Sequence, residues 1–231
     1  MKSAVLFSGG KDSVMALYKA LENGDEVAYL LSMISENDES FMFHVPNIHI
    51  TDLIAEAIEI PILKGYSEGE KEKELDDLEN QLIILKKNNV EAVYNGALFS
   101  NYQKTRIDRL CEKLGLKSIA PLWHIQEEDY MDEIINLGFE IIITGVSAEG
   151  LDESWLGRKI DKVAIEELKA IKKKYRINLN FEGGEAESLA IDGPIFKKRI
   201  KILKAENQWD IDNGVYNIKE AILEDKYEKI N

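Results

Sequence analysis

The first half of the chain alternates short apolar runs with longer amphipathic stretches. Four runs have the length of buried strands: residues 4–7, 26–34, 61–63 and 92–96. Four stretches between and after them have apolar residues at helical spacing: 12–22, 47–58, 71–87 and 103–114. Because strands alternate with helices, the pattern predicts an α/β fold with a doubly wound parallel sheet.

The pattern changes after Pro121-Leu122-Trp123. Helical spacing returns at residues 127–137 and 160–175, strands are predicted at 140–145, 200–203 and 214–218, and residues 180–185 are too polar and glycine-rich for a core element. The last two runs resemble antiparallel strands. We therefore predict two domains, 1–123 and 124–231, the second being a smaller α+β domain.

Composition places the chain among ordinary globular proteins. It has 231 residues, of which 45% are hydrophobic and 31% are charged. It has no apolar stretch of about 18 residues, so no transmembrane helix is expected. Cys111 is the single cysteine, which excludes a disulfide within the chain and suits a cytoplasmic protein.

The net charge of −14 disfavours nucleic acid as a partner, because an acidic surface repels phosphate backbones. Two basic runs, 172–176 and 197–201, are interpreted as a helix C-terminus and a solvated strand face. His44, His49 and His124 show no metal-ligand spacing, and we expect them to cap helices or to lie in the core.

A candidate anion-binding loop, Ser8-Gly9-Gly10-Lys11-Asp12-Ser13, follows the first predicted strand. A glycine-rich turn lets backbone N–H groups converge on a phosphate, and the following helix adds its dipole. The serines supply hydroxyls and Lys11 a positive charge, while Asp12 is interpreted either as a Mg²⁺ ligand or as a helix cap. The spacing fits neither a Walker A loop nor the Gly-x-Gly-x-x-Gly fingerprint.

This loop resembles the PP-loop of the N-type ATP pyrophosphatases. Further motifs narrow the resemblance: residues 41–47 (Phe-Met-Phe-His-Val-Pro-Asn), 96–106, 120–123, 182–188 (Glu-Gly-Gly-Glu-Ala-Glu-Ser) and 192–196. Together they resemble the diphthine–ammonia ligase (diphthamide synthase) family over residues 1 to about 200. The glutamate-rich motif at residues 182–188 departs from many relatives, with Ala186 in place of an aromatic residue and Ser188 in place of threonine.

The resemblance implies a Rossmann-like fold of the HUP type that binds ATP and Mg²⁺. It implies that a substrate carboxylate is adenylated with release of pyrophosphate, and that ammonium then displaces AMP. The protein substrate would be translation elongation factor 2 carrying diphthine, in the last step of diphthamide synthesis. This reading needs no membrane, and it is compatible with a homo-oligomer.

The resemblance and the residue chemistry together give a set of candidate site residues. Gly96 ends a strand where ligands bind in open α/β sheets, and Gln103 and Arg106 share a helix face. Arg158 is a further positive group, and Trp155 beside it offers a ring to a cation. The catalytic candidates are Lys11, Asp12, Glu182, Glu185 and Glu187; the ATP-binding candidates are Ser8, Gly9, Gly10, Lys11, Asp12, Ser13, Ser32, Met33, Gly96, Tyr102, Gln103 and Arg106; the metal ligand is Asp12.

The role of the three glutamates stays open between several chemistries. Clustered carboxylates suit Mg²⁺, ammonium or the quaternary ammonium of diphthine, or they orient a general base; a solvated acidic loop is the plain alternative. Two other functions remain. One is a PP-loop enzyme that amidates or thiolates a tRNA base or a small carboxylic acid, and the other is a non-catalytic nucleotide-binding protein.

Overall fold

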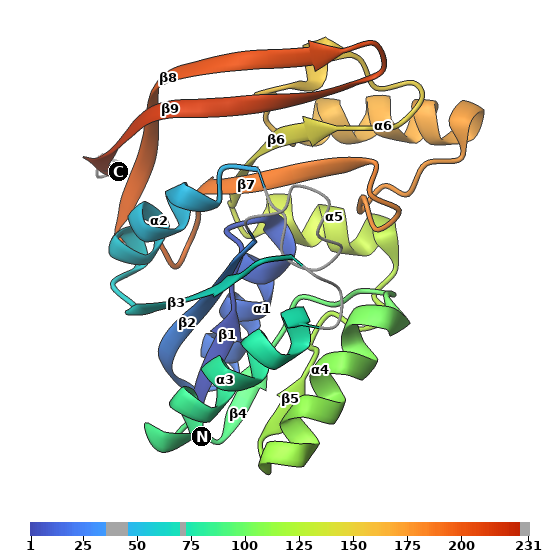
Figure 1. Cartoon of the computed structure of the whole chain (residues 1–231). Helices are drawn as coiled ribbons and strands as arrows, with labels where there is room; N and C mark the ends of the chain where they lie inside the picture. The colour runs from blue at the N-terminus through green and yellow to red at the C-terminus, as the bar shows by residue number, and fades with distance from the viewer. Residues whose placement is uncertain (36–45, 70–72, 227–231) are drawn as a thin grey trace. The chain divides into compact units, whose positions relative to one another are not determined.

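The computed structural model describes residues 1–35, 46–69 and 73–226, and these divide into two compact units (Figure 1). Unit 1 is made of Met1–Ser8, Asp12–Thr51 and Ile60–His124, and unit 2 of Gly9–Lys11, Asp52–Glu59 and Ile125–Asn231. The motif at residues 41–45, with His44, lies outside the described residues.

Unit 1 contains a parallel sheet, as the alternating pattern predicts. Its strand order is β3-β2-β1-β4-β5, and every neighbouring pair is parallel. The strands are β1 (Lys2–Leu6), β2 (Glu26–Ser35), β3 (Ile62–Ser67), β4 (Ala92–Tyr94) and β5 (Lys117–Ile119). The predicted α/β class with a doubly wound parallel sheet is confirmed.

The helices of unit 1 are α1 (Lys11–Glu22), α3 (Lys73–Lys87) and α4 (Asn101–Leu114), whereas α2 (Thr51–Ile58) falls in unit 2 except for its first residue. Helix α3 turns Leu78, Leu82 and Leu85 toward the sheet at i, i+4 and i+7, and they pack with Ile107 and Cys111 of α4. Figure 1 shows α3 and α4 on the same face of the sheet.

The single helix predicted over residues 47–58 is wrong in its first turn. Asn47 has φ of 63°, a left-handed conformation that an α-helix does not continue. A 3₁₀ turn, η1 (Ile48–Ile50), follows, and the Thr51 hydroxyl donates a hydrogen bond of 2.6 Å to the Ile48 carbonyl where α2 begins. The short strand β5 was not predicted, because its three residues give no measurable periodicity.

Unit 2 contains a four-stranded antiparallel sheet in the order β7-β6-β9-β8, which confirms the predicted α+β character of the second half. The strands are β6 (Glu140–Val146), β7 (Ala186–Asp192), β8 (Lys198–Asp210) and β9 (Asn213–Asp225), with η2 (Glu153–Trp155) and helices α5 (Glu127–Asn136) and α6 (Lys162–Tyr175). The two basic runs fall in the last turn of α6 and on β8, as expected.

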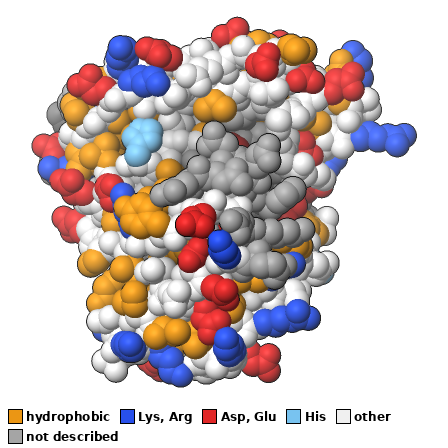
Figure 2. All heavy atoms as spheres, viewed as in Figure 1, with side chains coloured by type: hydrophobic (Ala, Val, Ile, Leu, Met, Phe, Trp, Pro, Cys, Tyr) orange, Lys and Arg blue, Asp and Glu red, His pale blue; other side chains and the backbone are white. Residues whose placement is uncertain are grey.

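Charged side chains of both signs are mixed on the face shown in Figure 2. Acidic residues outnumber basic ones by 43 to 29 in the whole chain. Within the described ranges, no helix combines the length and the apolar character that crossing a bilayer requires.

Candidate active site

The loop after β1 forms the tight strand-to-helix turn that the sequence predicts. Gly9 has φ of 79°, a conformation that favours glycine, and α1 begins two residues later at Lys11. Ser8 donates to the Ser13 hydroxyl from its backbone nitrogen (3.3 Å) and from its own hydroxyl (3.4 Å). The turn therefore presents the first amides of α1 at its N-terminus, which is the geometry that binds a phosphate.

Gly96 lies against the start of α1, where there is no room for a side chain. A Cβ atom added to Gly96 would lie 2.7 Å from the carbonyl carbon of Asp12 and 2.9 Å from its oxygen. These are backbone atoms, which cannot move aside as a flexible side chain can. Gly96 is therefore more than a turn residue, because it lets the end of β4 contact the residue proposed to hold Mg²⁺.

Ser32 and Met33 occupy the C-terminal half of β2 and differ in what their side chains do. Ser32 is fully buried, and among the described residues its hydroxyl has no hydrogen-bond partner. A buried hydroxyl without a partner costs free energy, so Ser32 is a position at which a ligand would gain a contact. Met33 packs over Gly65 and belongs to the core, which leaves only its backbone for recognition.

The first two turns of α4 bring Tyr102, Gln103 and Arg106 together. Ser100 caps the helix by accepting a hydrogen bond from the Gln103 amide at 3.4 Å. The guanidinium carbon of Arg106 lies 3.4 Å from the centroid of the Tyr102 ring, and Arg106 Nη1 donates to the Tyr102 carbonyl at 3.2 Å. Stacking fixes the plane of the guanidinium and leaves its rim for an anion.

Of the two roles expected for the histidines, a core position is wrong for the two that are described, and a capping role stays a prediction. His49 and His124 are both exposed. The His124 ring stacks on Phe99 and Trp123, with centroids 5.3 and 4.6 Å apart. Its polar edges stay hydrated while its faces are covered by aromatic rings, so an exposed position costs it little.

Lys11 is buried in unit 2, where it contacts β7 and two aromatic rings. Its backbone amide donates to the Ser188 hydroxyl at 3.2 Å, and the Ala190 amide of β7 donates to the Gly9 carbonyl at 2.9 Å. The Lys11 ammonium lies 5.9 Å from the centroid of Tyr130 and 5.5 Å from that of Phe181, and the residue is 3% exposed. The hydroxyl at position 188 thus has a defined task, which Ser performs in place of Thr.

The three candidate glutamates have different surroundings. Glu185 is 8% exposed, and its carboxylate accepts hydrogen bonds from the Asn178 amide (2.7 Å), the Asn178 side chain (2.8 Å) and the Gly183 amide (2.8 Å). Glu182 is half-buried, and Glu187 is exposed opposite Gly145 of β6. Glu185 therefore holds the loop in shape, whereas Glu182 and Glu187 are the members placed nearer to solvent.

A shared metal site of carboxylates finds no support in this arrangement. Over residues 1–35, 46–69 and 73–226, no group of three or more His, Cys, Asp or Glu is positioned to hold a metal ion. Asp12 remains the proposed ligand, and one carboxylate is enough for Mg²⁺ when phosphates supply other oxygens.

The ring of Trp155 is stacked against a cationic side chain of the same chain, that of Arg158. The Arg158 guanidinium lies 4.2 Å from the Trp155 centroid, and Arg158 Nη1 pairs with Glu167 at 2.6 Å. The Glu167 hydrogen bond raises the pKa of Arg158, and Arg158 in turn lowers the pKa of Glu167. Trp155 and Arg158 therefore contact each other, and their expected roles toward a substrate cation and toward phosphate stay predictions.

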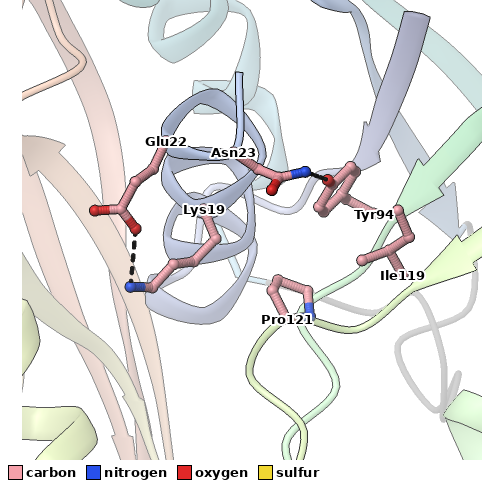
Figure 3. A pocket seen from close by; sticks show the side chains of 6 residues that line it. All are labelled: Lys19, Glu22, Asn23, Tyr94, Ile119 and Pro121. Carbon is pink, nitrogen blue, oxygen red and sulfur yellow. Dashed lines mark hydrogen bonds and ion pairs between the residues drawn. The ribbon is translucent and has the colours of Figure 1, made fainter. Parts of the chain in front are cut away.

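A cavity of about 410 Å³ lies in unit 1, and none of the candidate site residues is among the side chains that line it (Figure 3). Asn23 donates to the Tyr94 hydroxyl at 3.3 Å, and that hydroxyl donates to Asp25 at 2.7 Å. Burial raises the pKa of Tyr94, and the hydrogen bond to Asp25 adds to the shift. The lining residues are Lys19, Glu22, Asn23, Tyr94, Ile119 and Pro121.

Sequence reasoning missed the residues that support the candidate site. Glu127, Tyr130, Asn178 and Phe181 each contact a predicted site residue or its loop. Their residue types are ordinary for a helix start, a core position and a turn. Only the contacts reveal them: Asn178 bonds Glu185 seven residues away, and the other three contacts join residues more than 50 apart in the chain.

A parallel sheet with a glycine-rich loop between its first strand and first helix defines the class: an α/β protein of Rossmann-like architecture. Family models place it more narrowly. The diphthamide synthase N-terminal domain matches residues 1–118, and the diphthamide synthase C-terminal domain matches residues 126–223. The chain belongs to the diphthamide synthase family, and the resemblance seen in its motifs is confirmed.

Curated relatives agree with the family models. The diphthine–ammonia ligases of Bos taurus and Homo sapiens are each 32% identical over 226 residues, which cover 89% of this chain and 84% of theirs. The Schizosaccharomyces pombe ligase is 32% identical over 223 residues, covering 89% of this chain and 37% of its own. These relatives are named as ligases that join ammonia to diphthine.

Among solved structures, the predicted subunit of tRNA methyltransferase from Methanocaldococcus jannaschii is similar at 15% identity. The match covers 84% of this chain and 98% of that one, with a TM-score of 0.43. That score is too low to show a shared fold.

Proposed function

We propose that this chain is an ATP-dependent ligase that amidates diphthine on translation elongation factor 2, using ammonium as the nitrogen source. Family membership over residues 1–118 and 126–223 supports the reaction class. The observation that carries the proposal is the placement of Lys11. Its ammonium is buried, and its amide is hydrogen-bonded to Ser188, so the phosphate loop and the glutamate segment meet at one residue.

The proposed chemistry has two steps. A carboxylate is a poor acyl donor, so one of its oxygens attacks the α-phosphorus of ATP, forming an acyl adenylate and releasing pyrophosphate. Ammonia then attacks the acyl carbon, the bond to the adenylate oxygen breaks, and AMP leaves with its electron pair. The protein's task in the first step is to stabilise charge on the leaving pyrophosphate.

Specific residues are proposed for this task. The amides of the loop from Ser8 to Ser13, apart from those of Ser8 and Lys11 that serine hydroxyls accept, would hold phosphate oxygens together with the Lys11 ammonium and the Arg106 guanidinium. Ser32 and the Met33 backbone would meet the adenine, with Gly96, Tyr102 and Gln103 near the nucleotide. Asp12 would bind Mg²⁺, which would neutralise phosphate charge.

The glutamates are proposed to serve the second substrate and ammonia. Glu182 and Glu187 would attract ammonium and the quaternary ammonium of diphthine, because carboxylates stabilise cations. Glu185, whose carboxylate oxygens accept hydrogen bonds from Asn178 and Gly183, would act by holding the glutamate segment in place. Residues 1–123 would thus supply most of the ATP contacts, and residues 124–231 those to the protein substrate.

Other assignments have less support. A tRNA substrate would require a basic groove, which the net charge of −14 disfavours. A small carboxylic acid would fit the chemistry but not the names of the relatives. A non-catalytic nucleotide-binding protein would leave Glu182 and Glu187 without a task. We place the reaction in the cytoplasm.

The test is a turnover assay with ATP, Mg²⁺, ammonium and elongation factor 2 carrying diphthine. We expect AMP and pyrophosphate, and a protein product lighter by about one mass unit as acid becomes amide. AMP without the mass change would point to another acceptor, and ADP or no turnover would refute the ligase.

A further inference from the structure

The segment that carries the glutamates has a backbone that must be held in place. Arg176 and Phe181 have φ of 60° and 62°, and Gly184 has φ of 79°. The left-handed region is unfavourable for residues with a Cβ and persists only where neighbouring groups enforce it. Glu185 enforces the second half of this segment through Asn178 and Gly183.

Glu127, the first residue of α5, enforces the first half. Its Oε2 accepts a hydrogen bond from the Leu179 amide at 2.6 Å and pairs with the Lys172 ammonium at 2.6 Å. The Glu127 side chain is only 25% exposed. One carboxylate oxygen thus joins the start of α5, the last turn of α6 and the glutamate segment, in surroundings dry enough to strengthen charge-assisted bonds.

The two elements that Glu127 joins also carry the aromatic rings beside Lys11. Tyr130 lies three residues after Glu127 on α5, and Phe181 lies two residues after Leu179. Both rings lie within 6 Å of the Lys11 ammonium, at 5.9 and 5.5 Å from ring centroid to Nζ. The Glu127–Leu179 bond therefore links the two segments whose rings lie beside the Lys11 ammonium.

The neighbouring residue Glu128 shows what an ordinary surface pair looks like. Its side chain is 65% exposed, and it lies 3.3 Å from Lys169. Exposed pairs of this kind contribute little. Glu127 differs because it accepts a backbone amide of the glutamate segment as well as pairing with a lysine.

We propose that Glu127 is a positioning residue for the ligase reaction, acting through Tyr130 and Phe181 on the Lys11 ammonium and through Leu179 on the glutamate segment. This inference rests on the proposed function. In this proposal, helix α5 aligns the Lys11 ammonium, which would bind pyrophosphate, with the carboxylates of Glu182 and Glu187, which would bind the second substrate. Misplacing the Lys11 ammonium is expected to destabilise the transition state more than it weakens ATP binding.

The experiment compares Glu127→Ala, Glu127→Gln and the matched control Glu128→Ala in the full chain. Glu127→Ala is expected to lower kcat about 10-fold, with KM for ATP changed less than about 2-fold, as for other residues that orient a reacting group. Glu127→Gln keeps an oxygen for the Leu179 amide and is expected to recover most of kcat. Glu128→Ala should match the wild type. A wild-type kcat for Glu127→Ala, or equal loss in the Ala and Gln variants, would overturn the proposal.

Two further variants protect the test against a folding defect. Glu127→Asp keeps the charge but withdraws the oxygens by one methylene, and we expect a lower kcat with an unchanged circular dichroism spectrum. Lys172→Met removes the ion pair but leaves the Leu179 bond, and we expect kcat within about 3-fold of wild type, because the bond to the Leu179 amide is the contact that positions the glutamate segment. Normal kcat in Glu127→Asp would contradict the role.

Hydrogen exchange provides a readout that does not require ligase activity. The amide of Leu179 should exchange faster in Glu127→Ala than in the wild type and in Glu128→Ala. Unchanged protection would show that the bond to Leu179 is not made, which overturns the positioning role. A wild-type chain that fails to amidate would instead refute the proposed function while leaving the exchange result intact.

Discussion

The amide of Lys11, the first residue of α1, donates a hydrogen bond to the hydroxyl of Ser188, 177 residues further along the chain. The first amides of a helix have no partner within the helix. Here one of them is satisfied by the strand that follows the glutamate loop, and the Gly9 carbonyl accepts from Ala190 of the same strand. The phosphate loop and β7 are thus fixed to each other through backbone and hydroxyl groups.

Ser188→Ala removes this acceptor from the buried Lys11 amide. Such a loss costs about 1–3 kcal/mol, and we expect kcat/KM for ATP to fall by about 10-fold. Ser188→Thr keeps the hydroxyl and should retain activity within a few-fold. Steady-state kinetics on both variants check this, and equal activity in the Ala and Thr variants would show that the bond is dispensable.

Gly96→Ala places a methyl group 2.7 Å from the backbone of Asp12. Since backbone must move to admit it, we expect a stability loss of about 1–3 kcal/mol and weaker ATP binding. Gly24→Ala is the control for a purely conformational cost, because its φ is 78° and no atom lies within 4 Å of the added Cβ. Urea unfolding and ATP titration measure the two effects. Unchanged ATP affinity in Gly96→Ala would contradict the close approach of β4 to α1.

Glu185→Ala leaves three donors of residues 178 and 183 without their acceptor. We expect ATP binding to be retained and amidation to be lost, with unfolding free energy lower by about 2–4 kcal/mol. The matched comparison is Glu187→Ala, at an exposed position, which should lose amidation with little change in stability. Isothermal titration with ATP decides the matter: lost ATP binding in Glu185→Ala would contradict the division of roles.

Cys111 predicts a specific pH dependence. Burial, followed by the nearby charge of Asp108, raises the pKa of its thiol from 9.0 to about 11. The native state therefore keeps the proton over this interval while the unfolded state loses it, so Cys111 makes stability fall as pH rises from about 9 to about 11. The thiol should resist iodoacetamide at pH 8 in native protein and react in urea. Rapid alkylation of the native protein would show that Cys111 is not buried.

The fold was predictable where the chemistry is local. Apolar runs before glycine predicted β1 and β4, and helical spacing predicted α3 and α6, because burial of one face sets the period. Strand β7 was not predicted, since Ala186-Glu187-Ser188 lacks the β-branched residues typical of strands. Its pairing with β6 comes from tertiary contacts that a local pattern does not contain.

The sequence predicted which residues belong to the candidate site, but it did not predict the different contacts that each of them makes. The loop motif located Lys11, and the three glutamates were recognisable as a cluster. That Glu185 binds backbone amides while Glu187 faces solvent depends on the fold of residues 178–185, which no spacing rule predicts. The same holds for Arg158, whose guanidinium stacks on Trp155 and pairs with Glu167.

The most direct test of the central claim follows an oxygen atom. Elongation factor 2 whose diphthine carboxylate is labelled with ¹⁸O is incubated with the enzyme, ATP, Mg²⁺ and ammonium, and the nucleotide product is analysed by mass spectrometry, with Lys11→Ala as the inactive control. The account predicts one ¹⁸O in AMP for each amide formed, because the carboxylate oxygen bonds to the α-phosphorus and leaves with it. Label in inorganic phosphate together with ADP, or AMP without label, would contradict the acyl adenylate.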